Sequence, residues 1–143
     1  MNTRTNRPTR NDYRGVVVRK DLRLAIYLRD RFACIYCLAD LHGAAPSDIT
    51  LDHVRSQADG GSNEPSNLVT ACRSCNCSRQ DKPLSRFAGT EARAHVRRNT
   101  RRAIGVYRRL AKAILAGETE DPRGNVQRSS APAIDRRGPT YQA

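Results

Sequence analysis

Apolar side chains recur at helical spacing in two parts of the chain, residues 16–31 and residues 90–117. The first stripe, opposite a charged face, predicts a helix and comprises Val18, Leu22, Ala25 and Ile26. The second stripe comprises Val96, Ala103, Tyr107, Leu110 and Ile114. Its spacing predicts one long helix, weakened at Gly105 and ended at Gly117.

Between these two segments the pattern changes to short extended runs. Residues 49–54 are rich in β-branched and apolar side chains and predict a strand. The run 59–63, Asp-Gly-Gly-Ser-Asn, is a turn signal, after which residues 68–71 can pair back as a second strand. Residues 73–80 then predict a short helix that ends near Pro83.

Basic residues dominate the polar positions, and they are unevenly distributed. The net charge is +12, of which residues 86–116 carry +8 and residues 15–85 only +1. Arginine makes up 23 of the 26 basic residues, and its planar guanidinium pairs well with phosphate. A polyanion is therefore the expected partner, and a nucleic acid is the commonest one. An arginine-rich genome could explain the ratio of arginine to lysine, but it does not explain why the positive charge is clustered. The alternative for the helix arginines is that they form only a solvated face.

The apolar content limits the core and the number of domains. Only 5% of the residues are aromatic, so we expect one small domain stabilised by a covalent crosslink or by a metal. The expected organisation is a basic flexible arm (1–14), a compact domain (15–88), a basic C-terminal helix (89–117) and a disordered tail (118–143). No segment has the roughly 18 apolar residues of a membrane span, and the N-terminus lacks the apolar core of a secretory signal. We therefore expect a cytoplasmic protein that does not enter a membrane.

Two C-x-x-C pairs, Cys34/Cys37 and Cys72/Cys75, have the spacing of a tetrahedral zinc site. Disulfides or a redox pair are the alternatives, but two matched pairs in a reducing compartment favour structural Zn²⁺. Cys77 is then a spare thiol or, alternatively, a ligand in place of Cys75. Thirty-four residues separate the two pairs, more than the 15–20 of a simple zinc ribbon, so the metal encloses an insert.

The insert carries the residues on which a family resemblance rests. They are Leu51-Asp52-His53-Val54, Gly60-Gly61-Ser62-Asn63 and Asn67-Leu68, and Asn76 directly follows the last zinc cysteine. In this order, over residues 34–76, the sequence resembles the HNH endonuclease family, in the subgroup with a Cys₄ zinc. The resemblance implies an α+β fold with a ββα-metal nuclease core held by the zinc, flanking helices and disordered termini. The domain over residues 15–88 is then the HNH nuclease domain with an N-terminal helix.

The resemblance also implies roles in the hydrolysis of DNA phosphodiester bonds. His53 corresponds to the general base, which suits an imidazole that titrates near working pH. Asn67 corresponds to the residue that fixes the loop beside the base. Asp52 and Asn76 correspond to ligands of a catalytic divalent ion. Because Asn76 replaces the commoner histidine, the ligand set is all oxygen and favours Mg²⁺ or Mn²⁺.

Arginines complete the expected site. Arg79 replaces a lysine that is common at this point of the family pattern and could neutralise phosphate. The expected nucleic-acid contacts of the basic helix are Arg97, Arg98, Arg101 and Arg102. The alternative function is a non-catalytic, zinc-ribbon-like module that binds nucleic acid, or a degenerate HNH domain. The apolar stripe of the basic helix could also join two copies into a homodimer.

Overall fold

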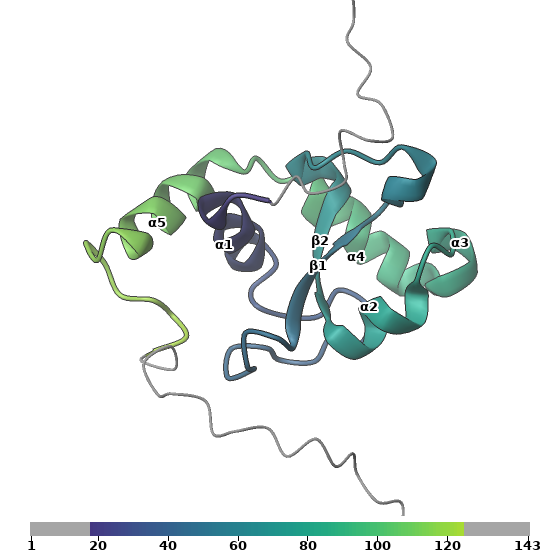
Figure 1. Cartoon of the computed structure of the whole chain (residues 1–143), viewed down its shortest axis with the longest axis horizontal. Helices are drawn as coiled ribbons and strands as arrows, with labels where there is room; N and C mark the ends of the chain where they lie inside the picture. Colours follow the sequence, from purple (N-terminus) through teal and green to yellow (C-terminus); the bar gives the residue numbers. More distant parts are fainter. Residues whose placement is uncertain (1–17, 125–143) are drawn as a thin grey trace, which may run out of the picture.

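The computed structural model describes residues 18–124 and places helices on both sides of a two-stranded antiparallel sheet (Figure 1). The elements are α1 (Lys20–Arg29), β1 (Ile49–His53), β2 (Leu68–Cys72), α2 (Arg73–Arg79), α3 (Leu84–Phe87), α4 (Thr90–Thr100) and α5 (Gly105–Leu115). In Figure 1 α1 and α5 lie on one side of the sheet, and α2, α3 and α4 lie on the other. The order β1, β2, α2 is a ββα unit, so the predicted α+β class is confirmed. Among the described residues, no helix combines the length and apolar character needed to cross a membrane.

The two strands pair in a register that places His53 opposite Leu68. Both predicted strands and the short helix after them are confirmed, because their bounds differ from the prediction by a single residue. Side chains alternate between the two faces of a strand. Thr50 and Asp52 therefore share one face of β1, and His53 lies on the other.

Two apolar clusters hold the helices to the sheet. The larger cluster joins α1, α5 and both strands, and its buried members are Leu24, Ala25, Tyr27, Phe32, Cys34, Leu41, Ile49, Ala71 and Ala111. The smaller cluster joins α4 to β2 through Ile35, Val69 and Val96. Each cluster is small, which agrees with the low apolar content of the sequence.

The basic segment forms two helices instead of the single helix expected over residues 90–117. The break lies between Thr100, the last residue of α4, and Gly105, the first of α5. Val96 packs in the smaller cluster, whereas apolar residues of α5 pack against the larger one. Because α4 and α5 lie on opposite sides of the sheet (Figure 1), one straight helix cannot bury both halves of the stripe. The hydroxyl of Thr100 also donates to the carbonyl of Val96 at 2.7 Å, a contact that often bends a helix.

Two of the charged residues in the predicted first helix are buried and not exposed. The side chains of Arg29 and Asp30 are fully buried, and Nε lies 2.8 Å from Oδ1. Arg29 donates to the carbonyl of Leu68 at 2.6 Å, and Asp30 accepts from the amide of Thr70 at 2.8 Å. This ion pair satisfies polar groups on the outer edge of β2, which faces no further strand of the sheet.

The end of the described chain is more ordered than the sequence suggests. Residues 118–124 fall in the tail that we expected to be disordered. The guanidinium of Arg123, however, lies 5.3 Å from the ring centre of Phe32 and pairs with Asp121 at 2.6 Å. These contacts hold the segment against the domain. The expected basic arm (1–14) and the rest of the tail lie outside the described residues.

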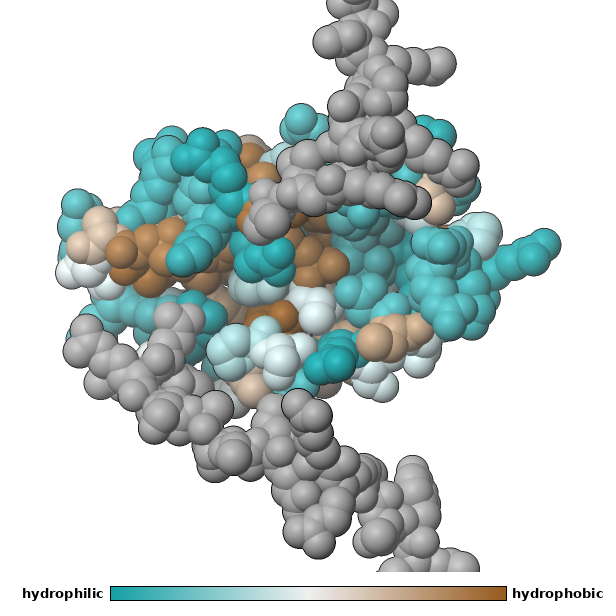
Figure 2. All heavy atoms as spheres, in the orientation of Figure 1, coloured by the Kyte–Doolittle hydropathy of each residue, from teal (hydrophilic) through white to brown (hydrophobic). Residues whose placement is uncertain are grey.

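Helix α5 keeps large apolar side chains at the surface. They are Val106, Leu110 and Leu115. Figure 2 shows an apolar band over α1 and α5, at the left of the view, while the right-hand half is mostly hydrophilic. The packing of α5 on α1 therefore leaves part of the predicted stripe uncovered, and the homodimer remains a prediction.

Candidate active site and zinc centre

Four cysteine side chains from distant parts of the chain converge at one end of the sheet. Cys34 and Cys37 follow α1, Cys72 ends β2, and Cys75 lies in the first turn of α2. Their sulfur atoms all lie within 4.8 Å of one another, and the Sγ atoms of Cys37 and Cys72 are 3.9 Å apart. Four sulfurs bound tetrahedrally at about 2.3 Å are roughly 3.8 Å apart. The predicted Cys₄ set therefore has the spacing of a zinc site.

The chemistry of these thiols also fits Zn²⁺. Burial raises the pKa of Cys75, and hydrogen bonds and charge from the other three cysteines raise it further. Four thiols this close cannot all ionise unless a cation neutralises them, and Zn²⁺ supplies that charge. All five cysteines are free of disulfides, and Cys77 is exposed and lies outside the cluster. The ligand set that the structure brings together is thus the one containing Cys75.

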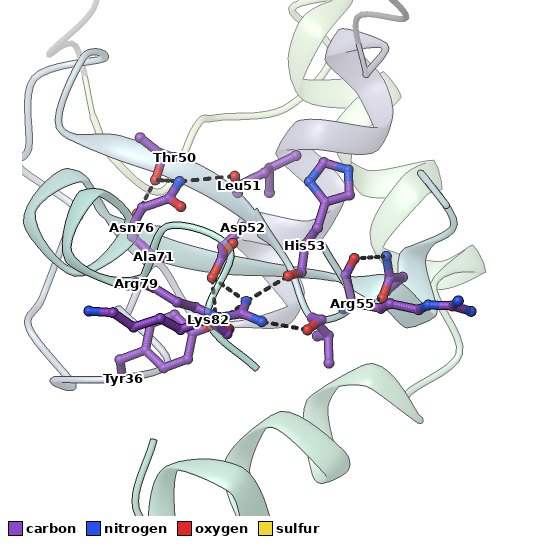
Figure 3. A network of polar contacts seen from close by, with 12 residues as sticks. Tyr36, Thr50, Leu51, Asp52, His53, Arg55, Ala71, Asn76, Arg79 and Lys82 are labelled. Carbon is purple, nitrogen blue, oxygen red and sulfur yellow. Dashed lines mark hydrogen bonds and ion pairs between the residues drawn. The ribbon is translucent and has the colours of Figure 1, made fainter. Parts of the chain in front are cut away.

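Asp52 is buried on β1, and two side chains hold its carboxylate (Figure 3). Oδ2 accepts hydrogen bonds from the hydroxyl of Tyr36 at 2.6 Å and from Nη1 of Arg79 at 2.7 Å. Burial raises the pKa of Tyr36, and the charge and hydrogen bond of Asp52 raise it further, so the hydroxyl stays protonated. One carboxylate oxygen is thus committed inside the protein, and Oδ1 is the oxygen left for a ligand.

Arg79 is buried and joins α2 to the end of β1. Its guanidinium donates to the carbonyl oxygens of His53 at 2.6 Å and of Val54. Its Nε donates to the carbonyl oxygen of Lys82 at 3.2 Å. Burial opposes ionisation, but the hydrogen bond and charge of Asp52, with those of the neighbouring phenol, raise the pKa of Arg79 overall. The phosphate contact predicted for Arg79 remains a prediction, and it would require the guanidinium to leave these partners.

His53 is the last residue of β1, and its half-buried ring points away from Asp52 (Figure 3). Its Nε2 lies 2.7 Å from Oδ1 of Asn63, in the loop that joins the two strands. An amide oxygen only accepts hydrogen bonds, so this contact assigns the imidazole proton to Nε2. In a neutral imidazole that carries its proton on Nε2, Nδ1 is the acceptor, and this is the form that a general base needs.

Asn67 braces the loop that carries Asn63. Its Oδ1 accepts from the amide of Arg55 at 2.8 Å, and its Nδ2 donates to the carbonyls of Arg55 at 3.1 Å and of Ser62 at 2.8 Å. The loop also needs a glycine at Gly61, because a Cβ built there would lie 1.8 Å from the Arg55 carbonyl oxygen. The loop-fixing role of Asn67 remains a prediction, and these contacts are compatible with it.

Asn76 lies in α2, over the face of β1 that carries Asp52. Its Nδ2 donates to Oγ1 of Thr50 at 3.0 Å and to the carbonyl of Leu51 at 3.2 Å. Both N–H groups of the amide are used, so its oxygen is the group left for a ligand. Since Thr50 and Asp52 share a face, Asn76 and Asp52 offer hard oxygen donors on the same side of the sheet. This pair fits Mg²⁺ or Mn²⁺, which would take its other ligands from water and phosphate.

The structure thus divides the predicted site between the two faces of β1. Asp52 and Asn76 lie on one face and His53 on the other. Because β1 ends at His53, the strand end is the only place where a single ligand can reach both faces of β1. A phosphodiester at the strand end is the arrangement in which all three residues could act together.

Only two of the four helix arginines predicted to bind nucleic acid line the same cavity. Arg98 and Arg102 line a cavity beside the loop after α1, and the lining of that cavity does not include Arg97 or Arg101. Arg102 is half-buried, and the other three are exposed. Their contact with nucleic acid remains a prediction.

Sequence reasoning missed two residues of the site. Asn63 was noted in the turn and in the family pattern but was given no role of its own, although a polar acceptor ten residues after a candidate base was a signal that could have indicated one. Tyr36 lies inside the first C-x-x-C pair, where its contact with Asp52 has no sequence signal.

Comparison with known proteins agrees with this geometry. The family model described as HNH endonuclease matches residues 34–82, about a third of the chain. This segment contains the zinc cysteines, β1, β2 and α2. The chain has no match among curated proteins and none among solved structures.

Proposed function

From the premise that residues 34–82 form an HNH domain, we propose that this protein is a metal-dependent endonuclease that hydrolyses phosphodiester bonds of DNA. One observation carries the proposal. A histidine whose Nε2 contacts an amide oxygen ends the same strand that carries a buried carboxylate, and an asparagine of α2 lies against that strand. A module that only binds nucleic acid has no need for this combination.

His53 acts as the general base in the proposed reaction. Its Nδ1 takes the proton of the attacking water while Nε2 keeps its hydrogen bond to Asn63. The water attacks phosphorus, the bond to the leaving oxygen breaks, and that oxygen takes up a proton. Asn67 keeps the loop closed, so the imidazole does not turn away during the reaction.

Asp52 and Asn76 would hold Mg²⁺ or Mn²⁺ through Oδ1 of each side chain. When bound, the ion supplies positive charge that stabilises the phosphorus centre and the leaving oxygen. Arg79 places a permanent positive charge against the other oxygen of Asp52. That charge weakens the attraction of the carboxylate for a second cation, so we expect metal binding to be weak and activity to need a high ion concentration.

Plasmid cleavage tests the proposal. Zinc-loaded protein should nick supercoiled DNA when Mg²⁺ or Mn²⁺ is added and should be inactive without it. His53→Ala should lower the rate by about 10²–10⁴-fold, the usual contribution of a general base. His42→Ala is the matched control, because His42 bonds to Asp40 and lies outside the elements that carry His53, Asp52 and Asn76. Near-wild-type cleavage by His53→Ala would exclude this mechanism.

The ion pair between Arg79 and Asp52 favours a second candidate, a degenerate HNH domain that binds DNA without cutting it. In that case Arg79 takes the place of the metal as the permanent partner of the carboxylate. The two candidates differ in the metal. Titration with Mn²⁺ should broaden the NMR signals of Asp52 and Asn76 in the nuclease and leave them unchanged in the degenerate domain.

A further inference from the structure

A basic groove lies between the loop after α1 and the second half of α4. It encloses about 230 Å³, and the side chains that define it are Arg31, Leu38, His95, Arg98, Asn99 and Arg102. The ion pair of Arg29 and Asp30 forms part of its wall. The groove therefore joins two segments that are far apart in the sequence: residues 29–38, from the end of α1 through the first zinc turn, and residues 95–102 at the end of α4.

The groove carries a large uncompensated positive charge. Arg29 and Asp30 neutralise each other. Within residues 18–124, Arg31, Arg98 and Arg102 have no carboxylate within ion-pair distance. Three guanidinium groups held around one concave site repel one another unless an anion lies between them, so the site is suited to phosphate groups.

The groove also presents an apolar side chain, which a site for free phosphate would not need. Leu38 is 54% exposed and directly follows the zinc ligand Cys37. Its backbone has a φ of 62°, a conformation that costs free energy for leucine and holds the side chain at the surface of the zinc turn. Alternation of charged and apolar groups matches a nucleic-acid backbone, in which phosphates alternate with sugars.

The groove lies near the end of the sheet where His53 is found. Arg29, in its wall, donates to the carbonyl of Leu68, and Leu68 is the partner of His53 across the sheet. A DNA strand carries a phosphate about every 3.4 Å along the helix axis. A backbone that crosses the strand end can therefore offer nearby phosphates to the groove.

We propose that this groove binds the DNA backbone at phosphates that flank the cleaved one, an inference that rests on the proposed nuclease function. The inference divides the four arginines that the sequence predicted to bind nucleic acid into two classes. Arg98 and Arg102 bind phosphate inside the groove together with Arg31, which no sequence pattern indicated. Arg97 and Arg101 lie outside it and contribute only long-range attraction.

Matched charge variants test this division. The full-length, zinc-loaded chain is titrated with a 20-base-pair duplex at several salt concentrations, without Mg²⁺ or Mn²⁺. Each lost phosphate contact lowers the slope of log K against log salt by about 0.9. Arg98→Gln/Arg102→Gln should therefore flatten the slope by about 1.8, and Arg31→Gln by about 0.9. Arg97→Gln/Arg101→Gln removes the same charge and should have less than half the effect of the first pair.

A second measurement uses the wild-type chain and does not depend on whether the variants fold. His95 lines the groove, so its imidazole NMR signal, assigned with His95→Gln, should shift when the duplex binds. The signal of His42, which does not line the groove, should move less than that of His95. A slope that flattens equally in both double variants, or an unmoved His95 signal, overturns the groove. Plasmid cleavage is measured separately. If the chain binds through the groove but never nicks plasmid, only the proposed nuclease function is refuted. If the chain nicks plasmid and Arg98→Gln/Arg102→Gln leaves the salt slope unchanged, only the proposed groove is refuted.

Discussion

The Nε2 atom of His53 lies 2.7 Å from Oδ1 of Asn63, so a neutral acceptor orients the candidate base. Replacing that acceptor by a carboxylate changes its charge but hardly its shape. In Asn63→Asp the new negative charge stabilises the protonated imidazole. The rising limb of the pH–rate profile should therefore move to higher pH, by about one unit or more.

Asn63→Ala is the control for this change. It removes the acceptor without adding charge, so the cleavage rate should fall while the rising limb stays at the same pH. The measurement is the initial rate of plasmid nicking from pH 5 to 9. Identical profiles for wild type and Asn63→Asp would show that this contact does not act on the base.

Arg79 gives a prediction about stability. Asp52 is buried beside it, and Arg79→Ala would leave the carboxylate without its counter-charge. Removing one partner of a buried ion pair costs about 3–5 kcal/mol. Urea denaturation of zinc-loaded protein should show this loss.

The exposed Arg73, in the same helix, gives the matched control. Arg73→Ala should change the free energy of unfolding by less than about 0.5 kcal/mol. Adding Asp52→Asn to Arg79→Ala should restore part of the stability, because the unpaired charge is then gone. Equal stability of Arg79→Ala and Arg73→Ala would contradict the importance of the ion pair.

Local signals explain how much of the fold could be predicted. The strands, the turn and α2 follow from residue types close together in sequence, and so does the C-x-x-C spacing of the zinc cysteines. Where local propensity and packing disagreed, the prediction failed. Residues 101–104 have no strong helix breaker, and the chain breaks there because Val96 and α5 pack on different clusters.

Burial of charged groups was the part of the site that local patterns could not reveal. Arginine is normally a surface residue, and Arg79 is buried only because it meets a carboxylate and carbonyls from the end of β1 and the residue after it, 25 to 27 positions earlier in the chain. Arg29 is satisfied in the same way by the edge of β2. Such partners become visible only once the strand register and the helix positions are known.

The zinc centre gives a prediction about folding. Elemental analysis of metal-loaded protein should find about one Zn²⁺ per chain. Cys34→Ser removes a buried ligand and should lower both the zinc content and the melting temperature, because metal binding at such a site contributes folding free energy. Cys77→Ser is the control and should leave both unchanged, since Cys77 lies outside the cluster. A chain without zinc, whose melting curve is the same in Cys34→Ser, would rule out the structural metal.

The contact between α5 and α1 predicts a pH dependence. Nε of Arg108 lies 2.8 Å from Oδ2 of Asp21, and this hydrogen bond holds the pKa of Asp21 below its usual value against the opposing effect of burial. A carboxyl whose pKa is lower in the folded state stabilises the protein above its unfolded pKa, and this stabilisation is lost as the pH falls through the folded pKa. Asp21→Asn should therefore melt at a lower temperature than wild type at pH 7. The difference should shrink below about pH 4 and vanish once Asp21 is protonated in both states. Asp81→Asn, at an exposed position, is the control and should have the melting temperature of wild type at every pH. If the difference in melting temperature between Asp21→Asn and wild type stays constant down to about pH 2, well below the usual pKa of an aspartate, the ion pair is not its cause.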